Sequence, residues 1–213
     1  MSWLTDLIDF VQKRPDRLLD LTIAHLRLSF MALGIAAIIY FPLGVLFSRL
    51  GRTGANAAGA ISSLRVIPSL ALVFLFYPWL GFGLRPALVA LVILAAPALI
   101  VNTHAGLANV DAFTLEAAKG LGMNPAQVFL RVQLPLALPV IIAGLRLAAI
   151  EVLASATLAS FVGAKTLGQY ILTGISLLDT TYLLAGGIPI VILVLLTDLI
   201  LSGIERLVTP PAF

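Results

Sequence analysis

Long apolar stretches separated by short polar connections are the dominant pattern in this 213-residue chain. A helix needs about 20 apolar residues to cross the hydrocarbon of a membrane, and these runs are too long and too regular for strands. We therefore expect an all-α, polytopic membrane helix bundle with about five transmembrane helices. The expected spans are roughly Leu26–Phe47, Ala57–Leu80, Pro86–Val101, Leu136–Val162 and Leu183–Ile204.

The composition fits a lipid environment and excludes several classes of function. Hydrophobic residues make up 61% of the chain and charged residues 11%, whereas a soluble domain is about one quarter charged. The absence of cysteine excludes disulfides and cysteine-based metal sites. The net charge of +3 comes from scattered basic residues without interleaved aromatic residues, so we expect membrane lipid and no nucleic acid among the partners.

The two ends of the chain differ from its central region. We interpret residues 1–24 as an amphipathic lead-in segment, residues 25–207 as the transmembrane domain and residues 208–213 as a C-terminal tail. Charged residues interrupt the first apolar stretch, which is therefore too broken for a signal peptide. Residues 2–12 instead indicate a short amphipathic helix, which lies either at the membrane interface or in solvent.

Basic residues alone do not settle the orientation of the spans. Cytoplasmic loops usually carry an excess of lysine and arginine. One set of connections holds Arg49, Arg52, Lys119, Arg131 and Arg206, and the opposite set holds Lys13, Arg14, Arg17, Arg27, Arg85 and Lys165. Five spans place the termini on opposite sides, but these two sets are too similar to show which side is cytoplasmic.

The longest polar interruption, Glu116–Pro135, begins with the pattern of a capped helix and a turn. Asp111 is suited to cap a short helix that continues to Leu121, with Glu116 in the early turns where the helix dipole favours an acid. Gly122 then permits a sharp turn.

A second helix start follows that turn. Asn124 is a capping residue, Pro125 occupies the first helical position, and Gln127 lies three residues after the cap. We expect Leu134–Pro135 to end this helix and Leu138–Pro139 to open the next span. The pattern predicts a helix-turn-helix outside the bilayer.

This segment resembles the EAA motif of the permease subunits of ATP-binding-cassette (ABC) importers. The motif consists of E-A-A, three residues, G, nine residues, an aliphatic residue, one residue and L-P. Its positions fall without a gap on Glu116, Ala117, Ala118, Gly122, Val132, Leu134 and Pro135. The resemblance implies the type I (MetI-like) permease fold, with a cytoplasmic coupling loop at about residues 105–135 that docks on an ATPase subunit.

Further stretches resemble the osmoprotectant branch of these binding-protein-dependent permeases, which imports glycine betaine, choline or carnitine. They are IPSLAL at residues 67–72, LPLALPVIIAGLR at 134–146 and SATLASFVGAKTLG at 155–168. The branch commonly has G-A-G-G-L-G where this chain has Lys165 and Thr166 in the central positions. The solute could therefore differ, and an amino acid or another small amine is the alternative.

The resemblance also implies partners and a mechanism. Two ATPase subunits bind ATP and Mg, this chain holds no cofactor and is not an enzyme, and a second permease chain, identical or a paralogue, completes the pore. An extracytoplasmic binding protein delivers the solute, which crosses by alternating access. The chain is expected in the cell (inner) membrane, with the N-terminus outside and the C-terminus in the cytoplasm.

Ionisable residues inside the spans are candidates for the translocation path, because a charge in hydrocarbon is costly unless it is paired or hydrated. Arg146 and Asp198 lie at similar depth, which predicts a structural ion pair between two helices, although Arg146 could instead line the inner cavity. Glu151 and Ser155 share one helix face. The carboxylate either lines the path of a cationic solute or is buried in helix packing.

Other readings of the chain have less support in its residues. A secondary transporter or channel would show inverted repeats, which we do not find. No catalytic motif of a hydrolase is present, and His25 and His104 lie at opposite edges of the membrane, so we expect no metal site. Tyr77, Trp79 and Phe82 gather at one span end, either as an interfacial aromatic belt or as a transient contact for a cation.

Overall fold

The computed structural model describes residues 2–209, with the backbone alone at residues 2–4, and this part of the chain contains helices and no strand. Residues 210–213 of the expected tail, and the side chains of Trp3 and Leu4 in the lead-in helix, lie outside the described part. The α-helices are α1 (Ser2–Lys13), α2 (Pro15–Arg49), α3 (Gly51–Ser62), α4 (Ser69–Leu75), α5 (Tyr77–Leu80), α6 (Leu84–Ala108), α7 (Ala112–Gly120), α8 (Pro125–Val128), α9 (Leu134–Ser155), α10 (Gly168–Leu177) and α11 (Thr180–Val208). Two 3-10 segments, η1 (Ser63–Val66) and η3 (Ala156–Val162), and one π-helical turn, η2 (Phe129–Gln133), complete the series.

Within residues 2–209, four helical segments are long and apolar enough to cross a membrane. They are α2, α6, α11 and the uninterrupted helical stretch Pro125–Val162 that contains α9. The remaining expected span, Ala57–Leu80, is not one helix but a broken pair, Gly51–Val66 and Ser69–Leu80. The expected total of about five is therefore reached only if this pair counts as one span.

Pro68 explains the break in the second expected span. The chain tightens into η1, and Pro68 then adopts extended backbone angles, φ −59° and ψ 130°, before α4 begins at Ser69. Proline has no N–H to donate, and its ring disfavours helical geometry in the residue before it. A single unbroken helix from Ala57 to Leu80 is therefore wrong.

The chain divides into two compact units, and each long helix contributes to both. Unit 1 contains Met1–Ile35, Val66–Ala95 and Ala149–Thr197, and unit 2 contains Ala36–Arg65, Ala96–Ala148 and Asp198–Phe213. The divisions fall inside α2, α6, α9 and α11.

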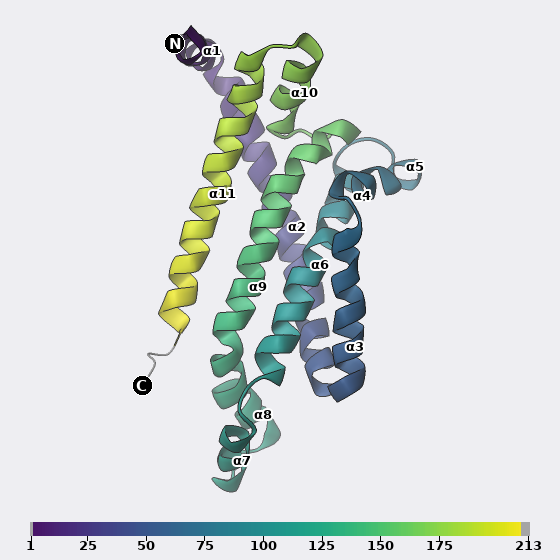
Figure 1. Cartoon of the computed structure of the whole chain (residues 1–213), viewed down its shortest axis with the longest axis vertical. Helices are drawn as coiled ribbons and strands as arrows, with labels where there is room; N and C mark the ends of the chain where they lie inside the picture. The colour runs from purple at the N-terminus through teal and green to yellow at the C-terminus, as the bar shows by residue number, and fades with distance from the viewer. Residues whose placement is uncertain (1, 210–213) are drawn as a thin grey trace. The chain divides into compact units, whose positions relative to one another are not determined.

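Unit 1 is held together around α10, which folds back beside the beginning of α11 (Figure 1). A side chain at Gly174 would overlap Leu183 at 2.8 Å, so glycine permits this close approach. Leu21, Leu167 and Tyr170 form the buried centre. The His25 ring Nε2 lies 3.0 Å from the Leu153 carbonyl oxygen, which joins α2 to α9 by a buried hydrogen bond.

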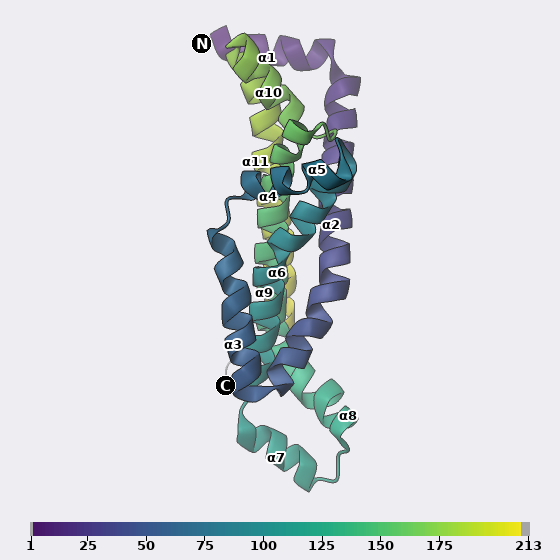
Figure 2. The same ribbon diagram turned by 90° about the vertical axis from the view of Figure 1, so that its right-hand side faces the viewer.

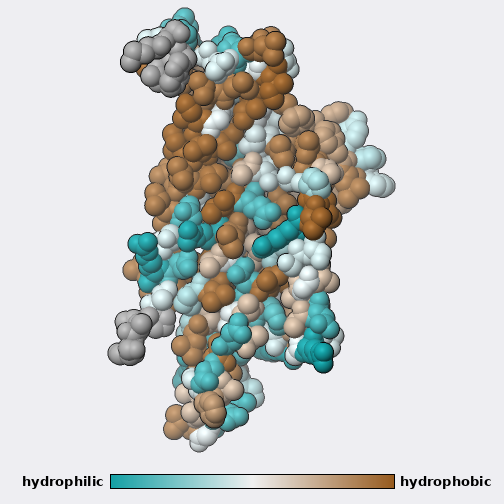
Figure 3. All heavy atoms as spheres, viewed as in Figure 1, coloured by the Kyte–Doolittle hydropathy of each residue, from teal (hydrophilic) through white to brown (hydrophobic). Residues whose placement is uncertain are grey.

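Large apolar side chains remain on the outside of unit 1. Figure 3 shows them gathered over α10 and the first part of α11. Ile175, Leu178, Ile188, Val191 and Ile192 are among the exposed residues there. Water would disfavour such a surface, whereas hydrocarbon does not, so this exterior suits a lipid-facing helix layer.

Unit 2 is organised by the close packing of α6 against the neighbouring halves of α2 and α9. Gly44 of α2 faces Thr103, and Gly144 of α9 faces Asn102, with no room for a methyl group at either glycine. The Asn102 amide donates to the Ala98 carbonyl oxygen at 2.7 Å, so its polar group is satisfied within its own helix. Small residues thereby allow helix backbones to approach closely, as is common in membrane proteins.

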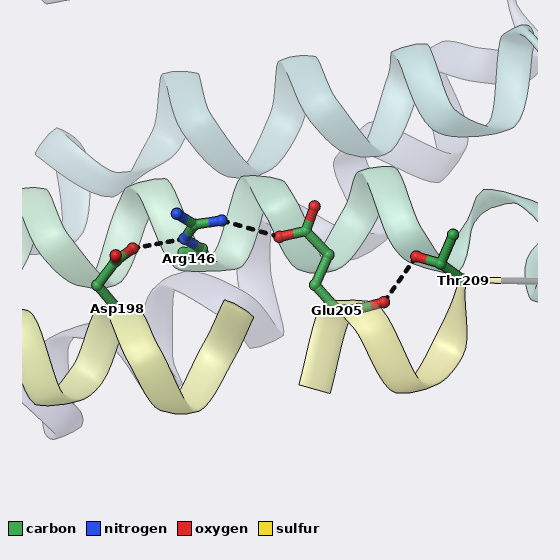
Figure 4. Close-up of polar contacts among 4 residues, drawn as sticks. All are labelled: Arg146, Asp198, Glu205 and Thr209. Carbon is green, nitrogen blue, oxygen red and sulfur yellow. Dashed lines mark hydrogen bonds and ion pairs between the residues drawn. The ribbon is translucent and has the colours of Figure 1, made fainter. Parts of the chain in front are cut away.

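An arginine and two carboxylates join α9 to the end of α11 within unit 2 (Figure 4). Arg146 donates from Nε to Asp198 Oδ1 at 2.5 Å and from Nη1 to Glu205 Oε2 at 3.1 Å. The predicted Arg146–Asp198 pair is thus present, and Glu205 is a second partner that the sequence reasoning missed. Asp198 and Glu205 are two helical turns apart and share a face, so one guanidinium group can reach both.

Removing one member of this trio leaves charges without their partners inside a span, which is more costly than removing the whole group. We expect Asp198→Asn to lower the apparent melting temperature of the purified protein more than Glu205→Gln, because the Asp198 contact is the shorter. The double variant Arg146→Met/Asp198→Met should lose less than the single variants Arg146→Met and Asp198→Met added together. Thermal unfolding in detergent measures all five variants, and additive losses in the methionine series would show that the two charges do not interact.

Candidate functional site

The EAA residues Glu116, Ala117 and Ala118 lie on α7, a nine-residue helix in unit 2 that begins after Asp111. Ala118 is buried, whereas Glu116 and Ala117 are exposed. Two large apolar side chains of this region, Phe113 and Leu121, are also exposed, at 80% and 82% of their surface. The helix therefore presents an unpartnered surface that combines a carboxylate with apolar groups.

Asp111 fixes the beginning of α7 as predicted. Its carboxylate accepts hydrogen bonds from the Thr114 N–H and the Thr114 hydroxyl, both at 2.9 Å. These two hydrogen bonds, the one from the backbone N–H foremost, lower the pKa of Asp111 below its usual value. The side chain is consequently ionised at neutral pH, which suits the positive end of the helix dipole.

Gly122 forms the predicted sharp turn at the end of α7. Its φ of +84° lies in the left-handed region, where glycine has no steric penalty. The N–H of Gly122 donates to the Lys119 carbonyl at 2.9 Å, and the N–H of Met123 donates to the Ala118 carbonyl at 3.3 Å. This pair of hydrogen bonds is a Schellman motif, which satisfies the last carbonyls of the helix.

The second helix begins with the predicted capping box. Asn124 Oδ1 accepts from the Gln127 N–H, and Gln127 Oε1 accepts from the Asn124 N–H, each at 2.9 Å. Pro125 occupies the first turn, where its missing N–H costs nothing. α7, the turn and α8 together form the expected helix-turn-helix, and both views show the two helices connected by this turn (Figures 1 and 2).

The predicted end of this second helix is wrong. α8 does not stop at Leu134–Pro135 but continues through η2 into α9, and Pro139 lies inside α9. In η2 the Leu134 N–H donates to the Phe129 carbonyl, five residues earlier, which widens the turn. The wider turn accommodates the ring of Pro135, which would otherwise strike a carbonyl of the preceding turn.

A cavity of about 550 Å³ lies between α7, α8 and the end of α2 in unit 2. The Arg49 guanidinium carbon lies 5.1 Å from the centre of the Phe129 ring, a cation–π distance. Gln133 donates to the Leu107 carbonyl at 3.1 Å and ties η2 to α6. From the sequence, Arg49 was used only to judge the orientation of the spans. No neighbouring residue in the sequence indicates that it contacts Phe129.

The other EAA residues lie on the continuous helix. Val132 is in η2, and Leu134 and Pro135 begin α9, so they belong to the connection between the helix-turn-helix and the long helix. Val132 and Leu134 are half-buried and Pro135 is exposed. The seven EAA residues therefore lie in one unit but in different elements. Some are on the exposed helix α7 or in the turn after it, and the others are where η2 joins α9.

The candidate path residues lie in two different parts of α9. Arg146 belongs to unit 2, where the two carboxylates of α11 engage it. Glu151 and Ser155 belong to unit 1, are half-buried, and occupy the last two turns of α9 on one face. Five residues amount to about 140° of rotation, so Arg146 and Glu151 do not share a face. A role of Glu151 in solute passage stays a prediction.

Residues 40–210 match the family described as binding-protein-dependent transport system inner membrane component. The choline transport system permease protein OpuBB of Bacillus subtilis is 37% identical over 96% of this chain and 94% of its own length. The carnitine transport permease protein OpuCB of Listeria monocytogenes is 36% identical over 97% of this chain and 94% of its own length. The osmoprotectant import permease protein OsmW of Salmonella typhimurium is 35% identical over 96% and 98%.

Solved structures give the same result for the fold. A chain of the MetNI methionine ABC transporter in an inward-facing conformation has a TM-score of 0.78 and 25% identity, covering 91% of this chain and 97% of that one. The predicted MetI-like permease fold is thereby confirmed. Because the family match covers most of the chain and the relatives align along nearly its whole length, this protein is a member of the binding-protein-dependent transport system inner membrane component family.

Proposed function

We propose that this chain is the permease subunit of an ATP-driven importer of a small quaternary ammonium compound such as glycine betaine, choline or carnitine. The observation that carries the proposal is the capped helix-turn-helix of residues 111–128, which exposes Glu116 beside unpartnered apolar groups. The names of the relatives from Bacillus, Listeria and Salmonella support the solute class. An amino acid or another small amine is the alternative solute.

The exposed surface of α7 is suited to dock into a cleft of an ATPase subunit. Phe113 and Leu121 supply apolar area, and Glu116 supplies a charge that can select a complementary partner. Two such ATPase subunits would bind ATP and Mg, so this chain itself would not be an enzyme. The proposed assembly also contains a second permease chain and a solute-binding protein outside the membrane. In this arrangement the C-terminus of the chain is cytoplasmic.

Continuity between α8 and α9 supports alternating access. A displacement of α7 and α8 by the ATPase is transmitted into α9 because η2 joins them without a break. Such coupling requires that the ATPase interacts differently with the two states of the permease. Gly122 forms the turn between α7 and this continuous helix.

Uptake by the complete assembly in vesicles tests the solute class. We expect ATP-dependent accumulation of labelled glycine betaine, choline or carnitine when the permease is reconstituted with its ATPase and binding protein. Vesicles without ATP are the control for leakage. Uptake of an amino acid and none of these three compounds would replace the quaternary ammonium assignment by the alternative.

Gly122→Asp tests the turn that joins the docking helix to the rest of the chain. Any side chain at φ +84° strains the turn, so the variant should lower uptake at least about tenfold while ATP hydrolysis continues. Gly120→Ala is the matched control, because Gly120 is helical and open space surrounds it. Wild-type coupling of hydrolysis to uptake in the Gly122 variant would contradict the role of this turn.

Glu151→Gln tests whether the carboxylate lies on the translocation path. Loss of its charge should reduce uptake of choline, a cation, by about tenfold, since a desolvated charge pair contributes strongly to binding. Ser155→Ala, one turn away on the same face, should cause a smaller loss. If choline uptake is unchanged while the protein remains folded, Glu151 serves helix packing instead.

A further inference from the structure

A second cavity, of about 410 Å³, is lined only by residues of unit 1. None of these residues belongs to the coupling loop of residues 105–135. Residues of α2, the first residue of α6 and the loop between η3 and α10 line it. Its volume is in the range of small-molecule sites in proteins. Nothing in the proposed coupling role accounts for it.

The charges around this cavity are of one sign. Arg27 of α2 and Lys165 of the loop line it, and no carboxylate does. Within residues 2–209, neither of these two residues takes part in an ion pair. Two cations without counter-ions beside an apolar surface repel each other and attract an anion.

The loop that carries Lys165 is held in place on both sides. Gly163 adopts a left-handed φ of +81°, and the Gly83 N–H donates to the Val162 carbonyl at 2.6 Å. Thr166 is fully buried, and its hydroxyl lies 2.6 Å from the hydroxyl of Ser160. The backbone is therefore fixed immediately before and after Lys165, whose side chain remains exposed at the cavity.

The helix that carries Arg27 is equally constrained. His25, two residues earlier, is hydrogen-bonded to the Leu153 carbonyl, and Leu28 is 1% exposed. Leu28, Met31 and Leu84 form the apolar wall of the cavity. The two cations are thus presented by rigid elements next to a surface that suits methyl or methylene groups.

We propose that this cavity is an oxyanion site, in which Arg27 and Lys165 bind a carboxylate or phosphate whose attached carbon groups contact the apolar wall. Two sources have this chemistry. One is the carboxylate of a zwitterionic solute such as glycine betaine or carnitine, which rests on the proposed function, and the other is the phosphate of a membrane phospholipid. Choline has no carboxylate, so the same two cations would repel it.

The test compares Arg27→Gln and Lys165→Gln with the charge-conserving variants Arg27→Lys and Lys165→Arg. Arg52→Gln, an equal loss of charge at an exposed position of unit 2, is the control. Uptake of labelled glycine betaine, carnitine and choline is measured in vesicles with the complete assembly. Native mass spectrometry of the detergent-purified complex measures the number of phospholipids that it retains.

If the solute carboxylate binds here, each Gln variant should lower uptake of glycine betaine and carnitine by about tenfold, corresponding to one lost charge-assisted hydrogen bond. Choline uptake should stay constant or rise, and the charge-conserving variants should retain uptake. If a phospholipid phosphate binds here, the Gln variants should lose a retained phospholipid and the three solutes should be affected equally.

Two results would overturn the oxyanion site. One is wild-type uptake of all three solutes together with wild-type phospholipid retention in both Gln variants. The other is an equal loss of all uptake with unchanged phospholipid retention, which would indicate a structural role of the two cations. If the wild-type assembly imports none of the three solutes, the proposed function fails, while phospholipid retention still tests the site.

Discussion

A backbone N–H or C=O group in hydrocarbon has no water to bond, and this constraint decides where the chain can be irregular. The long helices satisfy their own backbone groups, and unit 1 and unit 2 are built from halves of the same helices. Irregular segments carry local replacements for the lost hydrogen bonds. The widened turn before Leu134 is such a replacement, because the Leu134 N–H reaches the Phe129 carbonyl. The Schellman motif at Gly122 and the capping box at Asn124 satisfy the helix ends of the exposed helix-turn-helix in the same way.

Charged side chains also need a partner or water near hydrocarbon, and this chain meets that need in two different ways. Arg146 is engaged by two carboxylates of α11, so its charge is compensated inside the chain. Arg27 and Lys165 have no such partner among residues 2–209 and are exposed, so water or an external anion stabilises their charge. The first arrangement favours a fixed contact between helices, and the second favours a contact that can be exchanged.

Helix caps and turns were predictable from the sequence, whereas contacts between distant segments were not. The caps at Asp111 and Asn124 depend on three or four neighbouring residues, which the sequence displays directly. Pro68 and Pro135 are equally visible, yet one breaks a helix and the other does not. The difference lies in whether the surrounding backbone can rearrange its hydrogen bonds, as η2 does before Pro135.

The second carboxylate of the Arg146 trio shows the same limit. The seven-residue spacing of Asp198 and Glu205 was available in the sequence, but it does not reveal which cation they face. That choice depends on how α9 and α11 pack within unit 2. Similarly, the cavity at Lys165 requires α2, α6 and the loop after η3 to meet, which no periodicity predicts.

The π-helical turn η2 has a geometric consequence for the whole coupling segment. It contains one residue more than an α-helical turn, and one residue corresponds to about 100° around the axis. A helical wheel drawn through residues 125–145 is therefore out of phase on the two sides of η2. That single additional residue thus sets the rotation of α8 relative to α9 about the helix axis.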